Sequence, residues 1–221
     1  MDGRASFLIR VWMPDRPGVL GAVGTRIGAV KGDLVGIEIL EQGAGSAVDE
    51  LVVTLPDAGL VDLMVREINE IEGVGVESVE PLATADHDPQ LDALTTAEML
   101  VSAQTPDELA ASLCLHGRRC IGASWTALVD EAGRVLARDG DGPDDNWLRA
   151  FTFGSQAADL DQAVEVIQGI DTLASSLPSI GGSFVLGRRE GVFRARERRR
   201  VEAITRIADA WFSHVTGPAP V

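Results

Sequence analysis

Six consecutive residues near the N-terminus have the types and order of an anion-binding turn: Asp15-Arg16-Pro17-Gly18-Val19-Leu20. They lie where an alternating apolar segment, residues 6–13, gives way to a helical pattern. Pro17 suits the first position of a helix, where its missing N–H group costs nothing, and Gly18 lets a ligand approach the main chain. The N–H groups of Gly18, Val19 and Leu20 then lie at the positive end of the helix dipole. The junction therefore predicts a site for a carboxylate or phosphate, built from backbone atoms.

The elements that would position this turn form a complete small domain. Alternation predicts strands at residues 6–13, 34–41, 48–55 and 74–80, and a helical period predicts helices at 17–31 and 56–72. The order is βαββαβ, the ferredoxin-like arrangement, with both helices on one face of an antiparallel sheet. In the second strand we expect Val35, Ile37 and Ile39 to face inward. The other face would carry apolar side chains that the second domain or another subunit must cover, namely Leu8, Trp12, Leu34 and Val52.

Residues 6–82 resemble an ACT domain. The resemblance rests on the 15–20 turn and on the segment that leads into the second strand, Gly32-Asp33-Leu34-Val35-Gly36-Ile37. It implies a regulatory module that dimerises and binds an amino acid or a similar small ligand between subunits. The ligand contacts that it implies are Asp15, Arg16, Pro17, Gly18, Val19 and Leu20, together with Val35, Gly36 and Ile37 of a neighbouring subunit.

Three glycines on one face of the first helix favour a close approach at that face. Gly21, Gly24 and Gly28 lie beside the apolar stripe, although each glycine in a helix costs about 1 kcal/mol relative to alanine. Either another backbone or a ligand comes close there, or the helix packs tightly within its own subunit.

A second domain follows a small, polar, proline-containing linker. We place the first domain at residues 1–82, the linker at 83–92 and the second domain at 93–221. The pattern predicts an α/β/α domain with a central antiparallel sheet. Its expected helices are 93–103, 106–119, a short one around Trp147, 159–168 and a long one ending near His214, and its strands are 122–129, 134–137, 172–177 and 182–187. The fold class of the chain is thus α+β.

Residues 93–215 resemble a GAF domain more distantly. The resemblance rests on the run Ile121–Val129, the turn Asp130–Gly133 and the segment Leu177–Leu186 before a helix. Phe193 and Glu197 match two positions of the motif found in GAF domains that bind cyclic nucleotides. Gly187-Arg188 replaces the Asn-Lys of that motif and Arg198 replaces its final acidic residue, so the match argues for the fold rather than for a nucleotide.

No constellation of catalytic residues is present in the sequence. His87, His116 and His214 have no partners at metal-ligand spacing, and no nucleophile elbow or phosphate loop occurs. Cys114 and Cys120 share a helix, where buried structural cysteines are the common case. We therefore expect no catalytic residue, no metal and no cofactor, and a protein that is not an enzyme.

The composition limits the partners. The 221 residues carry a formal net charge of −15, which argues against nucleic acid, and the eight arginines between Arg188 and Arg206 lie in a half that is still acidic. No segment is apolar enough for a membrane span or a secretory leader, and two cysteines are too few for a disulfide framework. We expect a cytoplasmic protein.

These observations favour a homodimeric regulatory sensor that binds an amino acid through its carboxylate at the 15–20 turn, with the GAF-like domain as a second sensor or as the output surface. The alternative is an interaction or scaffold module that regulates a partner enzyme without binding a ligand. An enzyme that acts through the GAF-like domain is the remaining class.

Overall fold

The computed structural model describes residues 4–83, 85, 87–157, 162–167 and 170–216. The chain divides into two compact units. Unit 1 comprises Met1–His87 and Arg194–Arg196, and unit 2 comprises Asp88–Phe193 and Glu197–Val221.

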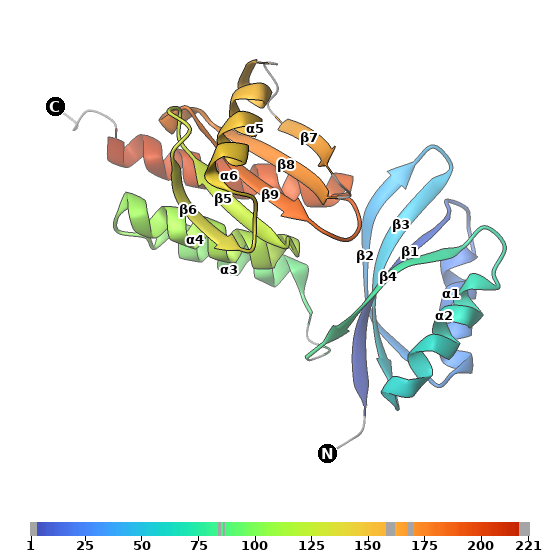
Figure 1. Ribbon diagram of the computed structural model, residues 1–221. Coiled ribbons are helices and arrows are strands. Elements are labelled where there is room, and N and C mark those ends of the chain that lie inside the picture. The colour runs from blue at the N-terminus through green and yellow to red at the C-terminus, as the bar shows by residue number, and fades with distance from the viewer. Residues whose placement is uncertain (1–3, 84, 86, 158–161, 168–169, 217–221) are drawn as a thin grey trace. The chain divides into compact units, whose positions relative to one another are not determined.

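Unit 1 has the predicted βαββαβ order, which confirms the first half of the fold prediction. Its elements are β1 (Ala5–Pro14), α1 (Val19–Ala29), β2 (Asp33–Gly43), β3 (Ser46–Leu55), the 3-10 turn η1 (Ala58–Leu60), α2 (Val61–Asn69) and β4 (Gly75–Leu82). The strands form one antiparallel sheet in the order β2-β3-β1-β4, and both helices lie on one of its faces (Figure 1).

The core of unit 1 lies between this face and the helices. Phe7, Ile9 and Val11 of β1 are buried there, as their alternation predicts. They stand opposite Val53, Leu51 and Asp49 of β3 in an unbroken register. From the helices, Val23 and Ile27 of α1 and Met64 and Ile68 of α2 complete the core.

The second strand differs from the prediction. Val35, Ile37 and Ile39 were expected to face inward, but their side chains are 48%, 49% and 44% exposed. The register shift between Leu34 and Gly36 brings Leu34 onto the core face, whereas Ile37 and Ile39 stand opposite Leu51 and Asp49 on that same face but remain exposed at the edge of the sheet. As a result Leu34 packs against the core beside the helices, rather than on the opposite face where it was expected. Alternation gives the period of a strand but not whether an edge strand is covered.

Unit 2 is a three-layer domain around a second antiparallel sheet, which confirms the other half of the fold prediction. Its elements are α3 (Pro89–Val101), α4 (Pro106–Ile121), β5 (Trp125–Val129), β6 (Val135–Gly140), α5 (Asp145–Ala157), β7 (Gln162–Ile167), β8 (Ile170–Leu177), the 3-10 turn η2 (Pro178–Ile180), β9 (Gly182–Arg188) and α6 (Ala195–Thr216). The strand order is β6-β5-β9-β8-β7.

Two of the helices of unit 2 begin at side-chain caps. The side chain of Asp88 accepts hydrogen bonds from the N–H groups of Gln90 and Leu91, so α3 begins at Pro89, within the segment predicted as a linker. Thr105 caps α4 through the N–H of Glu108, as the sequence predicts. The predicted helix at 159–168 is wrong: residues 162–167 form β7, while 158–161 and 168–169 lie outside the described residues.

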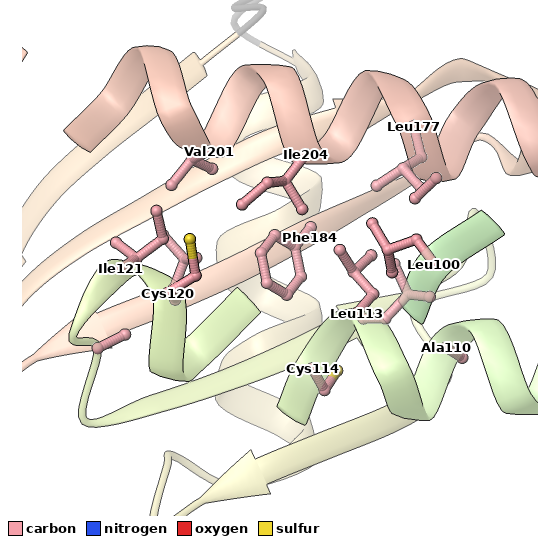
Figure 2. Close-up of a cluster of buried hydrophobic side chains, with 14 of the residues drawn as sticks. Leu100, Ala110, Leu113, Cys114, Cys120, Ile121, Leu177, Phe184, Val201 and Ile204 are labelled. Carbon is pink, nitrogen blue, oxygen red and sulfur yellow. The ribbon is translucent and has the colours of Figure 1, made fainter. Parts of the chain in front are cut away.

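The larger core of unit 2 packs α3, α4 and α6 onto one face of the sheet. Phe184 of β9 lies at its centre, surrounded by Leu113, Leu177 and Ile204 (Figure 2). A Cβ atom at Gly117 of α4 would lie 2.9 Å from the Phe184 ring, so glycine allows this close contact. On the other face of the sheet, α5 contributes Leu148 and Phe151 to a second cluster with Trp125.

Candidate functional site

The turn between β1 and α1 has a geometry that glycine makes possible. Gly18 has φ = 92° and ψ = −16°, a left-handed conformation that other residues adopt only at a cost. The helix begins at Val19, so Pro17 belongs to the turn and is not the first helical residue. The prediction that Pro17 opens the helix was wrong, because the left-handed Gly18 sets the start.

The first turn of α1 presents unused hydrogen-bond donors. The carbonyl of Gly18 accepts from the N–H of Ala22 at 2.9 Å, and the N–H of Val19 makes a long contact of 3.5 Å with the carbonyl of Arg16. Within the part of the chain that the structure describes, the N–H groups of Gly18, Leu20 and Gly21 have no acceptor. The first turn contains no acidic residue, so its positive end is uncompensated by its own side chains.

Asp15 ties this turn to the hairpin between β2 and β3. Its N–H donates to the carbonyl of Gly45 at 3.0 Å, and its Oδ1 accepts from Nε2 of Gln42 at 3.0 Å. Arg16 and Pro17 are exposed beside it. The turn is therefore held in place by the sheet while its outer surface stays open.

The glycine face of α1 is open. A Cβ atom at Gly21, Gly24 or Gly28 would meet nothing within 4 Å among the described residues. Tight packing within the same subunit, one of the two explanations for these glycines, is therefore wrong. The face is free for another molecule.

The predicted contacts on β2 lie along the edge of the sheet. Gly36 is close to β3, because a Cβ atom there would approach Val52 to 3.3 Å, and Val35 and Ile37 are exposed. These positions belong to the same sheet as the turn but were predicted to act from a neighbouring subunit, so their role stays a prediction.

In unit 2, Phe193 and Glu197, the two residues that match the cyclic-nucleotide motif, form an internal clamp with Arg188, which departs from it. Nη2 of Arg188 donates to Oε1 of Glu197 at 2.6 Å, and both side chains are buried, with 8% and 5% of their surface exposed. Arg188 also donates to the carbonyls of Ile121 and Gly122, and its guanidinium carbon lies 4.5 Å from the centre of the Phe193 ring. These polar groups therefore bind one another rather than a ligand, and their contacts join β9, α4 and α6.

The α5 face of unit 2 is filled with aromatic rings. Trp147 stacks on Phe151 with centroids 5.1 Å apart and meets Trp125 edge-on at 6.1 Å. A Cβ atom at Gly187 would lie 2.4 Å from the Trp125 indole, so the strand needs glycine to accommodate the ring.

Sequence reasoning missed a polar cavity of about 390 Å³ between β8, η2 and α6. Glu202, Arg206 and Asp209 line it. Asp209 is already engaged, because its Oδ1 accepts from both the N–H and the hydroxyl of Ser179. Apart from the charged residues of α6, no sequence pattern indicated this cavity.

The two cysteines are structural residues of the core. Cys114 and Cys120 lie in the cluster around Phe184 (Figure 2). Burial raises the pKa of the Cys114 thiol to about 12, so the thiolate needed for reactivity does not form at neutral pH. Among the described residues, no three His, Cys, Asp or Glu side chains are grouped as metal ligands would be. No helix within those same ranges has the length and apolar character needed to cross a bilayer.

Comparison with known proteins finds one family match, which lies within unit 1. The ACT-domain family model matches residues 7–73. No curated protein matches the chain. The ACT domain from the GTP pyrophosphokinase of Chlorobium tepidum is 16% identical, and the match covers 39% of this chain and 94% of that one with a TM-score of 0.30.

Two other solved structures match larger shares of this chain. The GAF domain from an Acinetobacter phosphoenolpyruvate-protein phosphotransferase is 11% identical, with 61% of this chain and 99% of that one covered and a TM-score of 0.44. Myxococcus xanthus MglB is 12% identical, with 53% and 98% covered and a TM-score of 0.43. The family match and the strand orders show an ACT-like βαββαβ unit followed by an α/β domain with an antiparallel sheet, and ACT domains are typically regulatory and ligand-binding modules.

Proposed function

We propose that this protein is a non-catalytic sensor that binds an amino acid by its carboxylate at the N-terminus of α1. The observation that carries the proposal is a set of three N–H groups at one helix end, those of Gly18, Leu20 and Gly21, which have no acceptor among the described residues. A carboxylate there would accept these hydrogen bonds and gain from the helix dipole. The match of residues 7–73 to the ACT-domain family supports a regulatory role for this unit.

The proposal includes a homodimer formed by unit 1. Its support is the open glycine face of α1 and the exposed apolar edge formed by Val35, Ile37 and Ile39. A second copy placed there would cover this edge and bring Val35, Gly36 and Ile37 of one subunit toward the 15–20 turn of the other. A ligand held between subunits would change their association, because it binds one arrangement better than the other. In this proposal the changed association alters the activity of a partner enzyme, and both proteins are cytoplasmic.

Thermal-shift screening of the twenty amino acids tests the binding site. A ligand that binds only the folded state raises the melting temperature by mass action. We expect one amino acid, or a group of similar ones, to raise it. We also expect Gly18→Val to remove the shift, since valine disfavours φ = 92° and narrows the approach to the amides.

The matched control is Gly191→Val, which places the same strain at a left-handed glycine of unit 2, at φ = 74°. It should lower the melting temperature but leave the ligand-induced shift intact. An absence of any shift in the natural protein, or an equal shift in Gly18→Val, would refute the site.

A second candidate function is protein interaction without a ligand. The same exposed edge of β2 favours it, because an apolar edge strand suits an added strand or a docked surface. Analytical ultracentrifugation of the Gly24→Ala variant tests whether the homodimer of the first candidate function is packed on the glycine face of α1. Alanine in an open helix position adds about 0.5–1 kcal/mol to the stability of the subunit, yet a dimer packed on the glycines should weaken.

A further inference from the structure

Asp49 is a buried carboxylate in the core face of unit 1. It lies in β3 on the same face as Ala47 and Leu51, both of which belong to the core under the helices. Directly opposite it stand Val11 of β1 and Ile39 of β2. An acid therefore occupies a position whose neighbours in the sheet are apolar.

The Asp49 carboxylate has no partner among the described residues. The residue is 4% exposed, and its buried Oδ1 receives no hydrogen bond. Its neighbour Glu50, on the opposite face, is paired with Arg10 at 2.9 Å. Burial, and then the charge of Asp15, raise the pKa of Asp49 above its usual value. An unpaired buried carboxylate costs free energy that a structural residue normally recovers through hydrogen bonds or a cation.

Asp49 lies at the end of the sheet where the 15–20 turn begins. Two residues beyond it, Ala47 pairs with Met13, and the next link across the two strands is the hydrogen bond from Asp15 to Gly45. The charge of Asp15, which belongs to the turn, acts on Asp49. This end of unit 1 thus combines free amide donors at α1 with two carboxylates, one of them buried and unpaired.

We propose that Asp49, assisted by Asp15, binds the ammonium group of the ligand whose carboxylate lies at the N-terminus of α1. The inference rests on the proposed function and narrows it. Amide donors for an anion and carboxylate acceptors for a cation at one end of the unit are complementary to a zwitterion, and the ammonium group supplies the positive charge that Asp49 lacks. Asp49 would therefore select the amino group of the proposed ligand and reject 2-hydroxy acids with the same side chain, since they leave the buried carboxylate unpaired.

Binding to the full-length protein, measured by thermal shift and calorimetric titration, tests this assignment. The probes are the twenty amino acids and the 2-hydroxy acids with the same side chains. Asp49→Asn should weaken amino-acid binding by about tenfold or more, and the free variant should melt at or above the temperature of the natural protein. Asp33→Asn, an exposed acid on β2 of the same sheet, is the control and should bind normally.

Ile39→Lys is a second variant, which tests the assignment even if Asp49→Asn does not fold. Its ammonium group would stand opposite Asp49 and occupy the ligand's place, so binding should be lost in a folded protein. Unchanged amino-acid affinity in Asp49→Asn, or 2-hydroxy acids that bind as tightly as amino acids, would overturn the role of Asp49. The latter result would leave the carboxylate site at α1 standing, whereas no response to either class of probe would overturn both.

Discussion

The two units of this protein treat a buried carboxylate in opposite ways. In unit 2, Glu197 is 3% exposed and is paired with Arg188, which is itself held by two carbonyls and a phenyl ring. In unit 1, Asp49 is 4% exposed and has no hydrogen-bond partner among the described residues. In unit 2 the two opposite charges satisfy each other, so this pair acts only in holding the fold. Asp49 has no cation beside it among the described residues, and we propose that the ammonium group of the ligand supplies that charge.

The largest expected effect comes from making unit 2 resemble unit 1. Arg188→Leu removes the arginine that is paired with the buried Glu197, and breaking such a pair costs about 3–5 kcal/mol. Urea unfolding followed by tryptophan fluorescence measures the loss, since Trp125 and Trp147 lie in this unit.

The control is the next residue along the chain. Arg189 pairs with Asp141, but these side chains are 57% and 93% exposed, so Arg189→Leu should cost about 0–1 kcal/mol. Similar losses in the two variants would show that the buried clamp is not what holds β9 to α6.

A smaller effect of opposite sign is expected when the unpaired charge of unit 1 is removed. Asp49→Asn should raise the free energy of unfolding at neutral pH by about 1 kcal/mol. The pKa of Asp49 is raised in the folded protein, so the natural protein gains stability as the pH falls through that pKa and the carboxylate takes up a proton. Val11 and Ile39 face Asp49 from the adjacent strands, and Asp15 acts on it from the turn.

Urea titrations between neutral and acidic pH give the measurement for this variant. The advantage of Asp49→Asn should be largest at neutral pH and should shrink on acidification. A variant that is less stable at every pH would mean that Asp49 has a favourable partner in the free protein.

The smallest expected effect comes from giving Asp49 the partner that Glu197 already has. Ile39→Lys places an ammonium group directly across from Asp49 on the neighbouring strand, and such cross-strand pairs contribute about 0.2–1 kcal/mol. Ile37→Lys is the control: Ile37 is similarly exposed but lies opposite Leu51, so the added lysine has no carboxylate directly across from it. Thermal melts of the free variants should show a gain for the first relative to the second. An equal change in both would place the added charge out of reach of Asp49.

The sequence predicted the architecture better than it predicted the site. Alternation in β1 and β3 was enough to place Phe7, Ile9 and Leu51 in the core, because both strands lie inside the sheet. It failed for Val35 and Ile39, since bulges and the lack of cover over an edge are set by the three-dimensional arrangement.

The candidate site shows the same division. The Gly18 turn was evident from residue types, but the start of α1 depended on a backbone angle that the sequence does not display. Asp49 is in phase with Leu51 and Val53, two apolar residues of the same strand that lie in the core. An acidic residue at a strand position that faces the core was therefore the sequence feature that could have identified Asp49. What the sequence could not reveal is that no basic side chain in the described part of the chain pairs with it.

The most direct test of the account follows the backbone amides of unit 1 by NMR while an amino acid that raises the melting temperature is added. We predict that the largest chemical-shift changes occur at Gly18, Leu20 and Gly21, the amides without acceptors among the described residues. The side-chain carboxyl resonance of Asp49 should move with them, and the amide of Gly59, which already donates to Asp57, should stay in place. Shifts that cluster in unit 2 while these three amides remain unchanged would contradict the central claim.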